Sequence, residues 1–269
     1  MIVEKIKANK DHVRIQIGNQ DYKTIFKVSL DDYLSLNYRV NQKLNETEIE
    51  KLKKMHLLAY SYNKCLRKLE SSDRSEKEIR ELLYPIKDLT DEDKNKIVEK
   101  LKLSGFLSDE AVVETQFYVD SIKQIGKNKT IQTLKRRGID SRLIEQYSAG
   151  VDDKQQFEMA VLKAEKILAT IKNRSFRETV NILKERLIKD GFENVNEVIA
   201  ALDLSKDEQN EYESVRIAYD KALRRYKNKY SDKKLYYNIY RYLLTKGFDS
   251  SLVRQILSSE SEEFEYEDQ

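Results

Sequence analysis

Residues 74–83 read RSEKEIRELL and residues 174–183 read RSFRETVNIL, so one short phrase occurs twice in the chain. In each copy a serine precedes a glutamate by three residues: Ser75 with Glu78, and Ser175 with Glu178. This spacing is typical of a capping box, in which the serine side chain accepts from the third helical amide and the glutamate returns to the serine amide. Apolar residues follow at helical spacing, so each phrase predicts the start of an amphipathic helix.

Weaker copies of the phrase occur near Gly126 and Ser231, which gives four copies with a period of about fifty residues. A second pattern repeats as well: a leucine is followed, at the same distance each time, by a glycine and then an apolar residue. It occurs in Leu134–Ile139, Leu187–Phe192 and Leu243–Phe248. Leu101–Phe106 repeats this spacing on another helix. A left-handed glycine followed by an apolar residue is typical of a Schellman motif, so Gly138, Gly191 and Gly247 are predicted helix ends.

These patterns predict a mainly α protein with about four tandem three-helix repeats in an elongated, curved array, preceded by a small β-hairpin. Alternating Val13, Ile15 and Ile17 and the β-prone residues 22–28 indicate the hairpin, and residues 29–38 suit a short helix followed by a strand. The predicted parts are a β-rich element at 1–45, repeats at 46–108, 109–155, 156–205 and 206–258, and an acidic disordered tail at 259–269.

Composition supports a helical protein and narrows its class. One Pro and seven Gly leave few helix breakers among 269 residues, of which 36% are charged. One cysteine excludes an intrachain disulfide, and no apolar run reaches the roughly 18 to 20 residues that span a bilayer. The start MIVEKIKANK lacks the apolar stretch of a signal peptide. We therefore expect a soluble, cytoplasmic protein that does not enter a membrane.

The residues suited to catalysis or metal binding are sparse. Two histidines and one cysteine cannot form a typical zinc site, and no phosphate-binding glycine loop occurs. Cys65 lies on an apolar helix face, which favours a buried, unreactive thiol. The acidic run 91–93 suits a helix N-terminus better than a metal. We expect no enzyme activity, no catalytic or metal-binding residues and no cofactor.

Two basic clusters are the candidate binding residues. The first lies in the second repeat and comprises Lys123, Lys127, Lys129, Lys135, Arg136, Arg137 and Arg142. The second lies in the fourth repeat and comprises Arg224, Arg225, Lys227, Lys229, Lys233 and Lys234, with Arg241 beyond them. Both suit a phosphate backbone, and the first suits a solvated helix face equally well.

Tyrosines are interleaved with the cations of the fourth repeat. Tyr236, Ile239, Tyr240 and Leu243 follow helical spacing, which favours a core position for that stripe. Tyrosines beside arginines also stack on nucleic-acid bases or anchor protein interfaces. The basic residues are therefore the better candidates for binding.

The phrase RSEKEIRELL, the segment Gly105 to Asp109 and the phrase GKNKTIQTLKRRGI together resemble the RecX family of recombination regulators. In the last phrase Ile131 stands one place later than the family pattern has its apolar residue. The resemblance is specific over residues 60–150 and extends through 258, and the fourth repeat goes beyond the three of shorter members. It implies tandem three-helix units and no catalytic residues.

The same resemblance implies partners. A monomer would bind RecA recombinase filaments on single-stranded DNA, and duplex DNA as a further ligand, and would limit filament growth in recombination, DNA repair and the SOS response. The alternative that the architecture leaves open is a helical-repeat scaffold for another protein or for RNA, because a fold alone does not fix function.

Overall fold

The structure is a computed structural model that describes residues 1–10, 12–19, 22–202, 204 and 208–267. Within these ranges only the backbone is described for 208–210, 232 and 260–267. The chain forms two compact units. The N-terminal unit contains residues 1–115 with 134–145, and the C-terminal unit contains 116–133 with 146–269.

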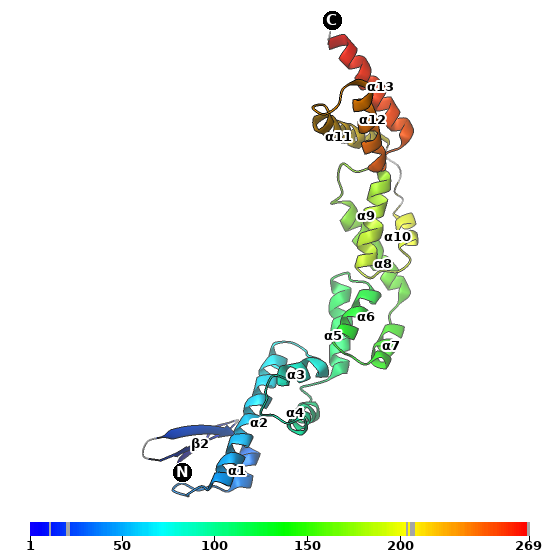
Figure 1. The fold of residues 1–269 in the computed structure, drawn as a ribbon. Coiled ribbons are helices and arrows are strands. Elements are labelled where there is room, and N and C mark those ends of the chain that lie inside the picture. Colours follow the sequence, from blue (N-terminus) through cyan, green and yellow to red (C-terminus); the bar gives the residue numbers. More distant parts are fainter. Residues whose placement is uncertain (11, 20–21, 203, 205–207, 268–269) are drawn as a thin grey trace. The chain divides into compact units, whose positions relative to one another are not determined.

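The N-terminal unit begins with an antiparallel sheet of three strands, ordered β1 (Ile2–Ala8), β2 (Val13–Gly18) and β3 (Lys23–Val28). The predicted hairpin is β2 and β3, whereas β1 was not predicted. Ile15, Ile17 and Phe26 lie on the inner face and pack with residues of α1 (Leu30–Leu36) and α2 (Glu46–Ser71). Figure 1 shows the sheet beside the first part of α2. The strand predicted after α1 is absent from residues 37–44, which hold only an isolated bridge between Lys43 and Ile2.

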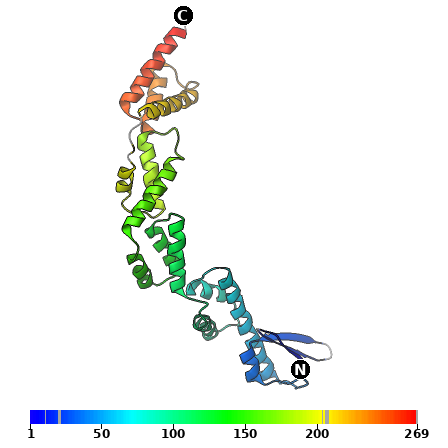
Figure 2. The same cartoon turned by 180° about the vertical axis from the view of Figure 1, so that it is seen from behind.

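The remaining helices follow in groups of three, as the sequence predicts. Repeat 1 contains α2, α3 (Glu76–Leu83) and α4 (Asp91–Leu103), and repeat 2 contains α5 (Asp109–Ile122), α6 (Lys127–Arg136) and α7 (Ser141–Ala149). Repeat 3 contains α8 (Asp153–Leu168), α9 (Phe176–Lys189) and α10 (Val195–Ala201). Repeat 4 contains α11 (Glu208–Tyr226), α12 (Asp232–Thr245) and α13 (Ser250–Glu267), whose packing Figure 2 shows from behind.

Repeats 1, 3 and 4 each enclose an apolar cluster of their own. Leu83 and Leu101 are fully buried in repeat 1, Leu183 and Leu187 in repeat 3, and Leu243 in repeat 4. Each cluster draws on all three helices of its repeat. Three helices are therefore sufficient to form a core, which is why the same unit can recur along the chain.

The predicted Schellman ends are confirmed. Gly138, Gly191 and Gly247 have φ of +79°, +85° and +83°. In each case the amide after the glycine donates to the carbonyl of the leucine five residues before it, for example Phe192 to Leu187 at 3.1 Å. Gly105 has φ +71° and the same bonds, but Phe106 stays exposed and Leu107 is buried instead. The apolar contact therefore shifts by one residue at that helix end.

The doubled phrase marks the places where neighbouring repeats join. The Ser75 hydroxyl donates to the Arg137 carbonyl at 2.6 Å, and the Ser175 hydroxyl donates to the Lys246 carbonyl at 2.7 Å. Both acceptors come directly before a left-handed glycine of the next repeat. Each serine therefore caps the middle helix of its own repeat. Its hydroxyl also donates to a carbonyl at the end of the middle helix of the next repeat. We call these contacts the junctions.

The junction between repeats 2 and 3 explains why the phrase has Gly126 in place of serine. There the Gly126 amide itself donates to the Asp190 carbonyl at 2.7 Å. A Cβ on Gly126 would overlap the backbone of Gly191, and a Cβ on Gly191 would overlap the backbone of Lys129. Only two glycines permit this closer approach. The imperfect copy of the phrase is thus a tighter form of the same contact.

The two predicted capping boxes differ. Ser75 and Glu78 form the complete box, with both reciprocal bonds at 3.2 and 2.8 Å. Ser175 accepts from the Glu178 amide at 3.1 Å, but the Glu178 carboxylate binds Arg174 at 2.6 Å. The second prediction was therefore half wrong, because the Glu178 carboxylate pairs with Arg174 instead of returning to the Ser175 amide.

The last helix is longer than predicted. It begins at Ser250 as expected but continues to Glu267, through most of the segment that the sequence assigned to a disordered tail. SSESEEFEYE contains no glycine or proline, so nothing in its backbone preferences ends the helix at 258. Residues 268–269 lie outside the described residues. Among the helices that the structure does describe, none has the length and hydropathy needed to cross a membrane.

Candidate polyanion-binding surfaces

The cations that the sequence predicts as binding residues in repeat 4 come from neighbouring segments of the chain. They lie at the end of α11, in the turn that follows and on α12, and we call them the repeat 4 surface: Arg224, Arg225, Lys227, Lys229, Lys233, Lys234 and Arg241. Every one is exposed. No carboxylate of the described residues forms an ion pair with any of them. An anion that arrives at this surface would therefore find cations that are not already neutralised.

The tyrosines of repeat 4 separate into core and surface. Tyr240 and Tyr242 are partly buried against the apolar cluster, whereas Tyr237 is 59% exposed. Cations lie over several of the rings: Arg241 is 5.9 Å from the centre of Tyr237, and Lys234 is 5.5 Å from that of Tyr230. The core prediction therefore holds for Tyr240, while Tyr237 offers an accessible ring held beside a guanidinium, which suits stacking with a base.

In repeat 2 the structure divides the predicted cluster, because three of its cations stabilise junctions. Lys129 binds Asp190 at 2.8 Å, and Lys127 binds Asp153 at 3.3 Å. Arg137 binds Glu78 at 3.0 Å and the Asp73 carbonyl at 2.8 Å. These three side chains already have acidic partners in a neighbouring repeat, so they are poor candidates for binding a polyanion.

These ion pairs also affect the pKa values of the acids that form them. Burial disfavours ionisation of Asp190, but hydrogen bonds and charges from Lys129 and Lys163 outweigh it, so the pKa of Asp190 lies below its ordinary value. Burial likewise opposes ionisation of Glu78, and the Arg137 guanidinium together with the Ser75 amide brings its pKa below the ordinary value. The junctions therefore favour the charged form of both acids.

The other cations of repeat 2 remain on the surface. Lys123, Lys135, Arg136 and Arg142 are exposed, whereas the Arg137 side chain is only 20% exposed. The sequence groups Lys135, Arg136 and Arg137 as one solvated set at a helix end. The structure corrects this grouping, because the third of them belongs to the junction with α3.

The groups that could support catalysis are few. Cys65 is fully buried, and burial raises the pKa of its thiol to about 11, which keeps the thiol protonated near neutral pH. Among the described residues no group of three or more His, Cys, Asp or Glu side chains could hold a metal ion. The predicted use of residues 91–93 is confirmed, because they form the first turn of α4 and Asp93 completes a capping box with Thr90.

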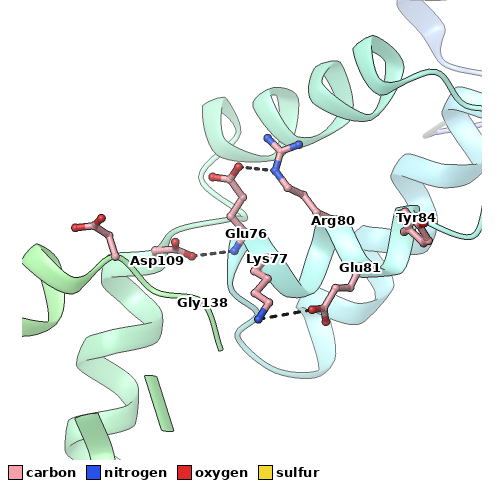
Figure 3. A pocket seen from close by; sticks show the side chains of 8 residues that line it. Glu76, Lys77, Arg80, Glu81, Tyr84, Asp109 and Gly138 are labelled. Carbon is pink, nitrogen blue, oxygen red and sulfur yellow. Dashed lines mark hydrogen bonds and ion pairs between the residues drawn. The ribbon is translucent and has the colours of Figure 1, made fainter. Parts of the chain in front are cut away.

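An open hollow of about 540 Å³ lies at the start of α3 in the N-terminal unit. Figure 3 shows its charged side chains turned toward one another rather than toward a vacant centre. Arg80 binds Glu76 at 2.7 Å, and the Asp109 carboxylate accepts from the Glu76 amide at 2.9 Å. Burial raises the pKa of Asp109, with the Glu76 charge adding to the effect. These contacts position α5 against α3, so the hollow serves the fold.

The cations of the N-terminal sheet were not predicted as binding residues from the sequence. Lys5 and Lys7 lie on either side of Ile6 in β1, a short alternation that could have indicated a strand, although the register shifts between Val3 and Lys5. Lys27 and Arg14 alternate with buried residues in the same way. Only the register of the three strands shows that these cations share one face of the sheet.

Fold and surfaces together define a class: a helical-repeat protein with exposed cations suited to an acidic or polyanionic partner. The family model described as the third three-helix domain of RecX matches residues 209–257, which is nearly all of repeat 4. Proteins named "Regulatory protein RecX" are similar along the chain. The one from Bacillus licheniformis is 28% identical over 93% of this chain and 95% of its own, and the one from Enterococcus faecalis is 27% identical over 88% and 90%.

A solved structure described as "Crystal structure of regulatory protein RecX" is similar with a TM-score of 0.58 and 21% identity, and covers 76% of this chain and 99% of its own. It supports the fold. The chain is therefore similar to RecX proteins along most of its length, and these matches support a RecX family protein. Repeat 4, which the sequence placed beyond the three repeats of shorter members, is thus similar to the third three-helix domain of the family model.

Proposed function

We propose that this chain is a non-catalytic regulator that binds RecA recombinase filaments on single-stranded DNA and mainly inhibits their growth, ATPase, strand exchange and coprotease activity. Similarity to RecX proteins supports the filament as the target. The repeat 4 surface carries the proposal within this structure, because the segment that matches the family model contains seven exposed cations with no ion pair to any described acid.

Phosphates explain why such a surface would bind a filament assembled on DNA. Each cation that neutralises a phosphate releases a counterion, so binding gains free energy that falls as salt rises. Tyr237 would add stacking on an unpaired base. Exposed cations of repeat 2, above all Lys135, would contribute further contacts. Tandem repeats suit a target that itself repeats, because one bound repeat raises the local concentration of the next.

The test is the single-strand-dependent ATPase of RecA, titrated with the full chain at substoichiometric amounts. We expect strong inhibition by the unaltered chain and weak inhibition by Lys227→Glu/Lys229→Glu. The matched control is Lys172→Glu/Lys189→Glu, which makes the same change in charge at exposed lysines of repeat 3. An unaltered chain that leaves the ATPase unchanged would favour the alternative, a scaffold for another protein or for RNA.

A further inference from the structure

The outer face of the N-terminal sheet carries a row of cations. The strand register places Lys7 opposite Arg14 and Arg14 opposite Lys27, so one cation from each strand stands in a single line. All three are exposed. Because neighbouring strands lie about 4.8 Å apart, the row is roughly 10 Å wide. Lys5 occupies the next position on the same face of β1, and Lys23 begins β3.

This arrangement is unfavourable for the isolated sheet. Like charges directly opposite one another on paired strands destabilise the pairing. Among the described residues, Glu4 is the one acid of this face, and it lies at the other end, where it pairs with Lys23 at 3.3 Å and accepts from Gln16 at 2.7 Å. Arg14 contacts only the His12 ring among the described residues, at 3.2 Å, and Lys7 and Lys27 have no ion pair there. Among the described residues of the unit, the row thus has no acidic side chain paired with it.

The row is held in place by the opposite face and by both edges. Val13, Ile15 and Val28 are fully buried beneath it, so a slip of one residue would bury the cations. The β1 edge is covered by residues 41–44, whose amides and carbonyls bind the backbone of Met1 and Val3. The β3 edge is covered at Lys27, whose amide donates to the His56 ring at 2.9 Å. The sheet is therefore a fixed platform rather than an open edge for another strand.

We propose that this outer face binds the phosphate backbone of a single-stranded nucleic acid, at a site separate from the repeat 4 surface. A fixed array of cations matches a chain that carries one phosphate per nucleotide, and the bound phosphates would relieve the repulsion within the row. Ile25 is exposed in the middle of the face and Tyr22 just before β3, which provides apolar contacts for bases. A membrane surface fits less well, because the described cations of this face outnumber Ile25 and Tyr22, whereas binding within lipid needs a larger apolar area.

The test uses a fluorescein-labelled 20-nucleotide oligothymidine, with binding followed by anisotropy at several salt concentrations. The background is the full chain with Lys227→Glu/Lys229→Glu, so that binding by repeat 4 does not mask the sheet. Into it we place Lys7→Glu/Lys27→Glu. The control is Lys68→Glu/Lys87→Glu, which reverses two exposed lysines of the same unit outside the sheet.

We expect the sheet variant to bind the oligonucleotide at least tenfold more weakly than the control, with a salt slope smaller by about 1.4 because two phosphate contacts are lost. The sheet should still fold, because the substitutions replace repulsion by attraction to Arg14. Amide hydrogen exchange of the unaltered chain provides the second measurement, with added oligonucleotide slowing exchange in residues 2–28. Equal binding by the two variants, no added protection of the strands, or a preference for phosphatidylserine vesicles would each overturn the proposal. Loss of RecA inhibition is not required, so this result and that of the ATPase test are independent.

Discussion

Replacing Gly191 by alanine should destabilise the chain in two separable ways. The first is backbone strain, because an L-residue at φ +85° costs about 1 to 2 kcal/mol. The second is the loss of close approach, because the new Cβ would overlap the backbone of Lys129 and force the junction between repeats 2 and 3 apart. Overpacking of this kind costs about 1 to 3 kcal/mol, so we expect a total loss of about 2 to 5 kcal/mol.

Gly105→Ala is the matched control for this substitution. Gly105 has a similar φ of +71° and ends a helix in the same way, but a Cβ there would meet nothing within 4 Å. We therefore expect only the strain, about 1 to 2 kcal/mol. Urea unfolding followed by circular dichroism gives the two losses, and hydrogen exchange in α6 and α9 locates the damage. Equal losses for the two substitutions, or unchanged exchange around Asn128 in Gly191→Ala, would refute the junction.

Three further predictions concern the junctions and the tail. Arg137→Glu should lower the free energy of unfolding by at least about 1 kcal/mol, because it places a second carboxylate beside Glu78. In a double-mutant cycle, Glu78→Lys in the same chain should restore part of this loss. Additive losses in the cycle would show that the pair does not interact. Acid should weaken the junctions, because the pKa values of Asp190 and Glu78 in the folded state lie below the ordinary ones. The stability that these two acids contribute is complete above about pH 4 to 5 and is lost as pH falls through the folded-state pKa values. Asp190→Asn should therefore flatten the fall in melting temperature between pH 5 and about pH 2, and an unchanged fall would contradict the assignment. Deleting residues 261–269 should shift the melting temperature by less than about 2 °C, because among the side chains that the structure describes the last buried one of repeat 4 is Ile256. A fall of several degrees would show that the tail supports the fold.

The repeats could be predicted from the sequence because their signals are local. A capping serine and a left-handed glycine act within one turn of a helix, so Ser75 and Gly191 mark helix ends without knowledge of tertiary structure. The use of the same serine hydroxyl to bind the next repeat could not be predicted, because its acceptor, the Arg137 carbonyl, lies far along the chain. For the same reason, the sequence shows Gly126 only as an imperfect copy of the phrase and not as part of a contact between repeats.

The basic clusters show the limit of charge patterns. Lys129 and Lys135 are equally cationic in the sequence, yet one pairs with Asp190 and the other stays exposed. Only contacts between residues distant in sequence separate a cation that joins repeats from one that can bind a ligand. The row of Lys7, Arg14 and Lys27 shows the opposite case. These cations look scattered in the sequence, and only the strand register brings them together.

The most direct test of the central claim is the affinity of the chain for RecA filaments on single-stranded DNA, measured across salt concentrations. We expect Lys227→Glu/Lys229→Glu to bind at least tenfold more weakly than Lys172→Glu/Lys189→Glu, with an affinity that depends less steeply on salt because phosphate contacts are lost. Identical affinities and identical salt slopes for these two variants, both fully helical by circular dichroism, would contradict the claim that the repeat 4 surface binds the filament.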